Sequence, residues 1–288
     1  MAEGMKRGLP WTFSDVDLDE EVMNAARNRR SDSKEKRHDI LQKFIQIICE
    51  DESIKLYVNV DFLMRFLRGG KFICERALRR LKVYYHTKRS HPEIFQDFLP
   101  SCTLLAQSLN HLSVFPFRAI SDNSIILIHK VGKFDPNVAT FEELMRLDYL
   151  VLESLLQNPV TQLCGVTLLI DFLGFSMLQT TQFTPRRMET IFELYHSFNT
   201  LRIVNVHIVN APGIAHSFFD ILKSRIMSRK MKNRVFIHSC EDNWTSLHSH
   251  FPPEVLPEEF SGHLKSSELV CVYDLINHNE DYFLEQLI

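Results

Sequence analysis

Closely spaced histidine and cysteine residues are the first candidates for chemistry in this sequence. His238 and Cys240 are separated by one residue, and so are His248 and His250. Each pair offers two ligands to zinc, because zinc prefers imidazole and thiolate ligands. The alternative is that His248 and His250 lie on the surface of a short helix before the prolines at 252 and 253. We favour this second interpretation and predict no metal site.

A cysteine–histidine nucleophile is the other chemistry that these residue types allow. The sequence has six cysteines and no CxxC pair, and the cysteines stand in apolar stretches, where thiols are usually inert. We therefore predict buried free thiols in a reducing compartment. The GxGxxG, GxxxxGK[ST], GxSxG and HExxH motifs are absent. These observations predict a protein that is not an enzyme and has no cofactor.

The composition limits the classes of protein to which this sequence can belong. Of 288 residues, 45% are hydrophobic and the net charge is −3, which is typical of a soluble globular protein and argues against a nucleic-acid binder with a basic surface. Phenylalanine is abundant at 22 residues, and this apolar bulk must line a core, a pocket or a partner surface. No segment has the composition of a secretory signal or a membrane span. We expect a cytoplasmic protein that contacts membranes only peripherally.

Positive charge is concentrated in two blocks. Residues 65–89 contain nine basic residues and one acidic residue, and residues 202–234 contain seven basic residues and one acidic residue. Each basic residue near an anionic bilayer contributes about 1 kcal/mol to membrane binding. A solvated helix face is the alternative, and for the first block alone it would be preferred.

The elements that must position these residues change along the chain. The first 110 residues show only helical periodicity, with Asp61 as a candidate N-cap, and a long helix is expected over 140–157 with a capping sequence at its start. Buried strands are expected at 125–129, 166–171, 203–209 and 235–238, separated by helices. Strands that alternate with helices indicate a largely parallel sheet with crossover helices. The fold class is therefore α/β, with a helical region in front.

The segment from Gly213 to about Met227 predicts an amphipathic helix just before the second basic block. Ile214, Phe218 and Leu222 share one face of it. The plain interpretation is a helix packed on the sheet. The alternative is a lid, whose apolar face closes a cavity while its basic end contacts a membrane.

Several ordered segments resemble the CRAL-TRIO lipid-binding family. They include Phe62-Leu-Met-Arg-Phe-Leu-Arg-Gly-Gly-Lys-Phe72, Gly165-Val-Thr-Leu-Leu-Ile-Asp-Phe-Leu-Gly-Phe175, Val206-His-Ile-Val-Asn-Ala-Pro212 and Leu256-Pro-Glu-Glu-Phe-Ser-Gly262. The resemblance covers about residues 40–280 and is strongest to the branch with tocopherol- and retinaldehyde-binding members and the clavesins. It implies a helical domain (31–95) and a lipid-binding domain (96–288) whose sheet and helices enclose an apolar cavity. The polar first 30 residues predict a flexible N-terminus (1–30) or a short helix around Leu18 to Asn28.

The resemblance also implies where a ligand would lie and favours the lid. By position, the cavity wall would include Met145, Asp148, Leu152, Val166, Leu194 and Tyr195. The buried strand at 166–171 adds Leu168 and Ile170, and we also assign Tyr149, Phe192 and the lid residues Ile214, Phe218 and Leu222 to the wall. Asp148 and Leu152 replace small hydroxyl residues of the tocopherol carrier, which argues against assuming tocopherol as the ligand.

A basic cleft for phosphoinositide head groups is the second implication. Arg202, Lys230 and Arg234 match its positions, whereas Val204 and Gly70 stand where family members have arginine. Arg68 and Lys71 are assigned as compensating residues, which leaves the head-group preference open.

Two functions of different class follow. One is a monomeric, non-enzymatic carrier that binds a tocopherol-, retinoid- or terpenoid-like lipid and moves it between membranes, with phosphoinositides as membrane partners. The other is a phosphoinositide-binding adaptor in endosomal or vesicle traffic, whose cavity serves stability only.

Overall fold

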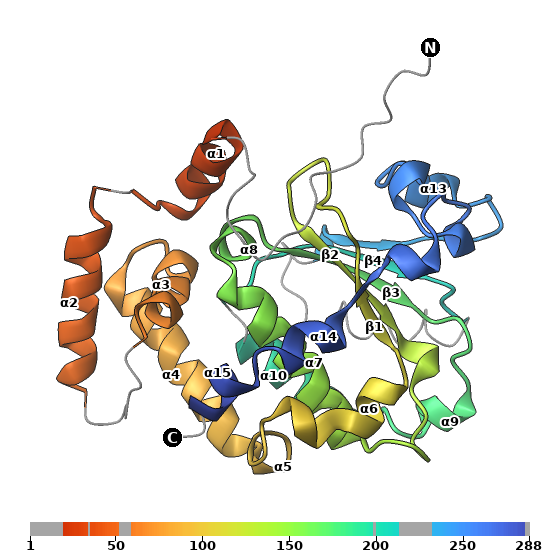
Figure 1. Ribbon diagram of the computed structural model, residues 1–288, viewed down its shortest axis with the longest axis horizontal. Coiled ribbons are helices and arrows are strands. Elements are labelled where there is room, and N and C mark those ends of the chain that lie inside the picture. Colours follow the sequence, from red (N-terminus) through yellow and green to blue (C-terminus); the bar gives the residue numbers. More distant parts are fainter. Residues whose placement is uncertain (1–19, 34, 52–58, 198–199, 213–231, 286–288) are drawn as a thin grey trace.

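The computed structural model describes residues 20–33, 35–51, 59–197, 200–212 and 232–285. The first part is helical, as the sequence predicts. Its elements are α1 (Glu20–Arg30), α2 (Arg37–Cys49), α3 (Val60–Gly69), α4 (Cys74–Ser90), α5 (Pro92–Phe95), η2 (Pro100–Thr103) and α6 (Leu104–Ser108). Figure 1 shows α1 to α4 side by side at one end of the molecule.

The start of α3 differs from the prediction. The N-cap is Asn59, not Asp61, because the Asn59 side chain accepts hydrogen bonds from the backbone N–H groups of Asp61 and Phe62. Asp61 instead lies in the first turn, where its negative charge interacts favourably with the helix dipole and stabilises the helix.

A six-stranded sheet forms the body. Its strands are β1 (Leu112–Val114), β2 (Ile125–Lys130), β3 (Val166–Asp171), β4 (Ile203–Val209), β5 (Val235–Ile237) and β6 (Val270–Cys271), in the order β5-β4-β3-β2-β1-β6. Strands β2 to β5 are parallel, as expected for strands joined by crossover helices, and β1 pairs antiparallel with both β2 and β6. The mostly parallel α/β fold is thus confirmed.

Local sequence signals mark where helices between β2 and β4 begin. In α7 (Phe141–Gln157) the Thr140 hydroxyl accepts from the Glu143 N–H at 3.1 Å, which confirms the predicted start. Pro159 does not only end a helix, because it is the first residue of α8 (Pro159–Cys164), which Asn158 caps. Further on lie α9 (Met177–Thr180) and α10 (Pro185–Ser197), which begins at the predicted Thr184-Pro185 step.

The two faces of the sheet belong to different clusters of buried residues. On one face Leu127, Leu168 and Val206 join the large cluster that includes α7 and Leu194 of α10. On the other face Ile128 and Leu169 pack with the segment around α13 (Thr245–His248). Figure 1 shows α13 on the opposite side of the sheet from α7 and α10. The sheet therefore separates a large apolar layer from a small one.

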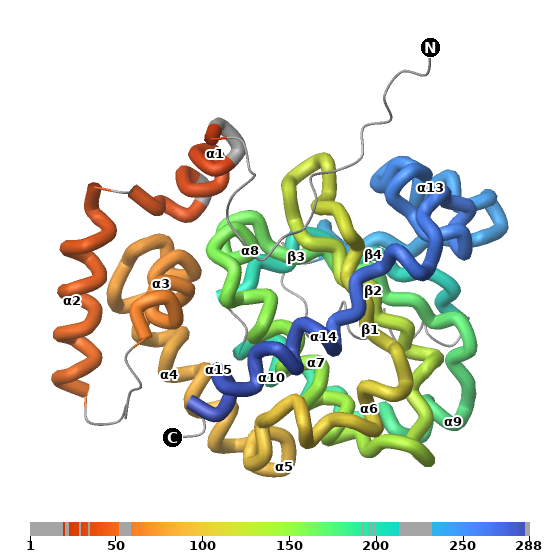
Figure 2. Tube along the Cα trace, in the orientation of Figure 1, coloured from red at the N-terminus to blue at the C-terminus, as the bar shows by residue number. Residues whose placement is uncertain are grey.

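The C-terminal segment ties the two ends of the molecule together. After β6, α14 (Val272–Asn277) and α15 (Glu280–Glu285) run back toward the first helices (Figure 2). The Phe283 ring contacts Phe98 edge-on at 5.6 Å between centroids. One cluster of buried residues spans both parts of the chain, from Leu41 to Phe283. The boundary at residue 95 between the helical and the lipid-binding domain stays a prediction. The large cluster of buried residues extends across it.

Two sequence expectations concern the surface. Only Cys74 and Cys164 are buried, whereas Cys49, Cys102, Cys240 and Cys271 are exposed free thiols, so the expectation of six buried thiols was wrong. None of the helices in the described ranges combines the length and hydropathy needed to cross a bilayer.

Candidate functional site

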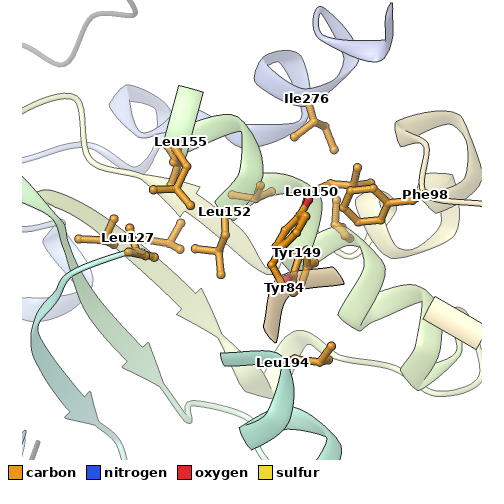
Figure 3. Packing of buried hydrophobic residues seen from close by; sticks show 14 of the residues in the cluster. Tyr84, Phe98, Leu127, Tyr149, Leu150, Leu152, Leu155, Leu194 and Ile276 are labelled. Atoms are coloured by element: carbon orange, nitrogen blue, oxygen red, sulfur yellow. The ribbon is translucent and has the colours of Figure 1, made fainter. Parts of the chain in front are cut away.

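The sheet face toward α7 presents the apolar strand residues named from the sequence. Val166 is fully buried, Leu168 is buried and Ile170 is half-buried, and they alternate along β3 toward the same side. Figure 3 shows Leu152 of α7 near Leu127 of β2, with Leu194 of α10 set apart from both. Leu152, Val166, Leu168 and Leu194 all belong to the large cluster of buried residues.

Helix α7 supplies four of the predicted wall residues, and all four are buried. Tyr149 is directed differently from Leu152, because its hydroxyl lies 2.7 Å from the Ser197 hydroxyl and its ring contacts Phe95 and Phe98. In Figure 3 Tyr149 lies beside Tyr84 and Phe98. Tyr149 thus joins α7 to α4, α5 and α10, while Met145, Asp148 and Leu152 are among the other buried residues of α7.

Tyr195 on α10 is partly accessible and lies near the charge of Asp148. The residue keeps 38% of its surface accessible. Nevertheless burial among protein atoms raises the pKa of its phenol well above the ordinary value, and the charge of Asp148 raises it further. Protein atoms therefore crowd the phenol, although part of the residue stays accessible.

His129, at the end of β2, shows the same combination. Its side chain retains 18% of its surface. Burial lowers the pKa of its imidazole, although Asp148 acts in the opposite direction. Tyr195 and His129 come from elements far apart in the chain, and Asp148 influences both.

A polar cluster of His111, His129 and Asp148 was missed by the sequence analysis. His111 Nε2 lies 3.0 Å from Asp148 Oδ1, and His129 Nε2 lies 3.9 Å from Asp148 Oδ2. His129 could have been found as a polar residue that ends an apolar strand opposite a charged residue in an apolar helix. His111 has no such signal, because its position depends on β1, which the sequence did not reveal.

The histidines named first as zinc candidates have other partners. His238 Nε2 lies 2.9 Å from His207 Nδ1, and His238 Nδ1 lies 2.8 Å from the Ser246 hydroxyl. His248 Nε2 donates to the Phe260 carbonyl at 2.9 Å. Both ring nitrogens of His238 are therefore engaged. Over the described ranges, the spacing needed for a three-ligand metal site occurs at His111, His129 and Asp148 alone.

Two predicted basic residues lie together at one end of the sheet. Arg202 precedes β4 and donates to the Cys164 carbonyl at 2.8 Å, and Arg234 precedes β5 and donates to the Ile203 carbonyl at 2.6 Å. Lys71 is exposed in the turn after α3. Arg68 is buried, forms an ion pair with Asp32 at 3.1 Å and also contacts Gln162.

The two basic blocks meet near this end of the sheet. Gly69 packs closely against Thr200 and the Arg80 side chain, which places the turn after α3 next to the residues that lead into β4. Burial lowers the pKa of Arg80, and the nearby charge of Arg76 lowers it further.

The predicted lid, with Ile214, Phe218 and Leu222, lies outside the described residues, and so do Lys230 and the side chain of Phe192. The residues before the lid are described. Asn210 adopts a left-handed φ of 52° at the end of β4, and its amide donates to Asp171 Oδ1 at 2.8 Å. The chain thus turns sharply away from the sheet next to the end of β3.

Comparison with known proteins identifies the class. Residues 121–262 match the family model described as the CRAL/TRIO domain. This chain belongs to the CRAL/TRIO domain family, which confirms the resemblance seen in its sequence.

Its relatives include two named groups. Alpha-tocopherol transfer protein-like of Homo sapiens is 30% identical over 270 residues, covering 93% of this chain and 78% of the relative. The Mus musculus protein of that name is 32% identical over 247 residues, covering 85% and 71%. Clavesin-2 of Mus musculus is 26% identical over 275 residues, covering 94% and 83%.

Proposed function

We propose that this protein is a non-catalytic carrier that binds one apolar lipid between the sheet, α7 and α10 and transfers it between membranes. The proposal is carried by membership of the CRAL/TRIO domain family, together with the buried apolar residues of β3, α7 and α10 that belong to one cluster. The half-buried Ile170, Ile191 and Ile237, which pack against the same cluster, support it by offering apolar surface to a guest. The names of the alpha-tocopherol transfer protein-like relatives support a lipid as that guest.

The driving force would be the removal of the lipid from water. A ligand that buries about 600 Å² of apolar surface gains roughly 15 kcal/mol before ordering and association costs are subtracted. Such a ligand leaves slowly unless the site opens. We propose that the segment from Gly213 onward is the lid that opens it, and that the left-handed turn at Asn210 is the point from which the lid moves.

We further propose that anionic lipid, a phosphoinositide in particular, promotes opening at a basic cleft. The cleft would contain Arg202, Lys230 and Arg234, with Lys71 from the turn after α3. The proximity of the α3–α4 turn to the start of β4 supports this assignment. The ion pair of Arg68 with Asp32 favours a structural role for Arg68. A lipid that promotes opening must bind the open state more tightly than the closed state.

The experiment compares wild type with the double variant Arg202→Glu, Lys230→Glu in phosphoinositide-containing vesicles. We expect weaker vesicle binding and slower transfer, with ligand loading nearly unchanged. The control is Lys36→Glu with Lys43→Glu, which reverses two exposed charges at and within α2 and should change neither quantity.

Two other outcomes lead to different conclusions. Equal losses of loading and transfer in the double variant would mean that the two residues act structurally. Strong phosphoinositide binding by a wild-type protein that carries no apolar ligand would replace the carrier with the adaptor in vesicle traffic.

A further inference from the structure

The apolar layer between the sheet and α7 has one polar end. Asp148 of α7, His129 of β2 and His111, which precedes β1, meet there, and the charge of Asp148 acts on Tyr195 of α10. These groups come from four parts of the chain, so the fold and not local sequence assembles them. Burying polar groups is costly unless hydrogen bonds satisfy them. The hydrogen bonds that these groups can still form therefore indicate what a ligand could offer them.

His111 fixes the orientation of Asp148. The His111 side chain has no accessible surface, and its Nε2 lies 3.0 Å from Asp148 Oδ1. Because Nε2 faces a carboxylate, it carries the proton and donates. Oδ1 is therefore occupied by a donor that cannot move without disturbing the core.

The other oxygen of Asp148 faces His129 but receives no hydrogen bond from it. Oδ2 lies 3.9 Å from His129 Nε2, which is too long for a hydrogen bond. Both side chains retain some accessible surface, 11% for Asp148 and 18% for His129, whereas His111 retains none. Asp148 and His129 are therefore not fully enclosed by protein, in contrast to His111.

We propose that the hydroxyl group of an otherwise apolar lipid alcohol binds in the gap between these two side chains, donating to Asp148 Oδ2 and accepting from His129 Nε2. This inference rests on the proposed carrier function and names the polar end of its ligand. One oxygen atom lies within about 2.8 Å of both atoms when they are 3.9 Å apart, so a single hydroxyl completes both hydrogen bonds.

The chemistry of the gap disfavours other groups. A fatty-acid carboxylate would meet the negative charge of Asp148. An ether has no proton to donate to Oδ2. A hydrocarbon would leave both Asp148 Oδ2 and His129 Nε2 without a hydrogen bond. A metal ion is disfavoured because a metal-bound histidine usually donates its second N–H to an acceptor, whereas the buried His111 Nδ1 has no partner.

The test uses two probes of nearly equal apolar surface, hexadecan-1-ol and hexadecyl methyl ether. Each labelled probe is partitioned between phosphatidylcholine vesicles and the delipidated full chain. The comparison of variants with wild type removes the difference in vesicle affinity between the probes. In Asp148→Leu we expect the affinity for the alcohol to fall about 10- to 100-fold relative to the ether, because a charge-assisted hydrogen bond is lost.

Three further variants sharpen the test. His129→Phe should lower the alcohol-to-ether ratio by a smaller factor than Asp148→Leu. Asp148→Asn keeps the shape and should give an intermediate loss, which serves if the leucine variant does not fold. Met145→Leu is the matched control on the same helix, and it should change the affinities for both probes alike. Retained ether binding shows in every case that the variant is folded.

Each contrary outcome has a distinct meaning. Equal changes for alcohol and ether in the Asp148 variants would overturn the hydroxyl site while leaving the carrier function intact. A wild-type protein that takes up neither probe would contradict the carrier function, and the hydroxyl site with it. One zinc ion per purified chain, lost in Asp148→Asn, would overturn the proposal and assign the cluster to a metal.

Discussion

Two carboxylates on α7 have different surroundings, and this difference separates a structural residue from a functional one. Glu153 is fully buried and receives two hydrogen bonds from the Arg65 guanidinium, at 2.6 and 3.3 Å. Arg65 also stacks over the rings of Phe62 and Tyr84. Asp148, in contrast, keeps one oxygen near an accessible gap. Glu153 joins α7 to the helical region, whereas Asp148 faces the proposed ligand.

The Glu153–Arg65 pair can be tested by unfolding in urea. We expect Glu153→Gln to lower the free energy of unfolding by about 3–5 kcal/mol, because the Arg65 charge would stay buried without its partner. Glu142→Gln is the control, since Glu142 pairs with Arg187 at 3.2 Å with about a third of each side chain exposed. That control should cost less than about 1 kcal/mol. Equal effects would show that the buried pair has no special structural role.

Residue-level charge counts from sequence overestimated the first basic block. Arg65 and Arg68 were counted as part of a positive patch, yet both are buried in ion pairs, with Glu153 and Asp32. The acidic partners lie 88 residues after Arg65 and 36 residues before Arg68. No local pattern announces such distant pairs, so the sequence alone could not distinguish a surface charge from a buried one.

At the scale of elements, the junction between α8 and β3 depends on a glycine. Gly165 has a φ of +93°, and a Cβ at this position would lie 2.3 Å from the Arg202 carbonyl oxygen. The close approach lets β4 pair with β3 at the point where their register shifts, between Val166 and Leu168. The same carbonyl accepts the Val166 N–H at 2.9 Å. The basic Arg202 is therefore positioned by a backbone contact that only glycine permits.

Gly165→Ala should destabilise the protein by more than about 2 kcal/mol, because it adds steric overlap with backbone to an unfavourable φ. Gly174→Ala is the matched control. Gly174 also has a positive φ, +81°, but the Gly132 carbonyl oxygen would lie 3.8 Å from a Cβ added there, which is ordinary van der Waals contact. We expect it to cost only about 1–2 kcal/mol for the backbone conformation. Thermal unfolding measures both, and equal losses would contradict the role of the close approach.

The small layer on the far face of the sheet contains stacked histidines that should make stability depend on pH. Burial, together with His238 and His250, lowers the pKa of His207 on β4 to about 3. Burial, followed by His250, lowers the pKa of His238 to about 4. In the unfolded chain each pKa would be about 6.5. The unfolded state therefore binds more protons between these values, and stability falls as pH decreases from about 6.5 toward 4.

Between pH 6 and pH 5 we expect wild type to lose up to about 1.4 kcal/mol per pH unit for each of the two histidines. His207→Phe should reduce this slope by about half, because one titrating group is removed while the stacking on Phe236 is kept. His86→Asn, at an exposed position on α4, is the control and should leave the slope unchanged. An unaltered slope in His207→Phe would show that other groups cause the pH dependence.

The elements themselves were predicted where their signals were long. The expected strands at 125–129, 166–171 and 203–209 correspond to β2, β3 and β4, and the long helix 140–157 corresponds to α7. The three-residue β1 and two-residue β6 were not predicted, whereas β5, also three residues long, was predicted as part of the apolar run 235–238. The antiparallel pairing of β1 and β6 to the sheet edge depends on partners far away in the chain.

At the scale of the whole molecule, the two regions expected from the sequence share one core. Tyr84 of α4, Tyr149 of α7 and Phe283 of α15 belong to the same cluster of buried residues. His91, just after α4, also lies 2.9 Å from Glu193 of α10. We expect the helical region and the sheet to unfold together, since the large cluster of buried residues is common to both.

The sequence predicted the apolar part of the site better than its polar part. Leu152, Leu168 and Leu194 follow from helical and strand periodicity together with the family resemblance, and all three belong to the large cluster of buried residues. The polar end requires β1 to deliver His111 beside Asp148, and this contact joins residues 37 positions apart. An apolar face produces a periodic pattern in the sequence. A pair of polar side chains that meet only through tertiary packing produces no such pattern.

The central claim is that one lipid occupies the space between the sheet, α7 and α10. The most direct measurement is native mass spectrometry of the purified full chain, followed by extraction and identification of what it releases. We predict one apolar molecule per chain, and a much lower occupancy in Leu152→Trp, whose indole would fill part of the space while the protein stays folded. A wild-type chain that carries no lipid and accepts none from vesicles would contradict the account.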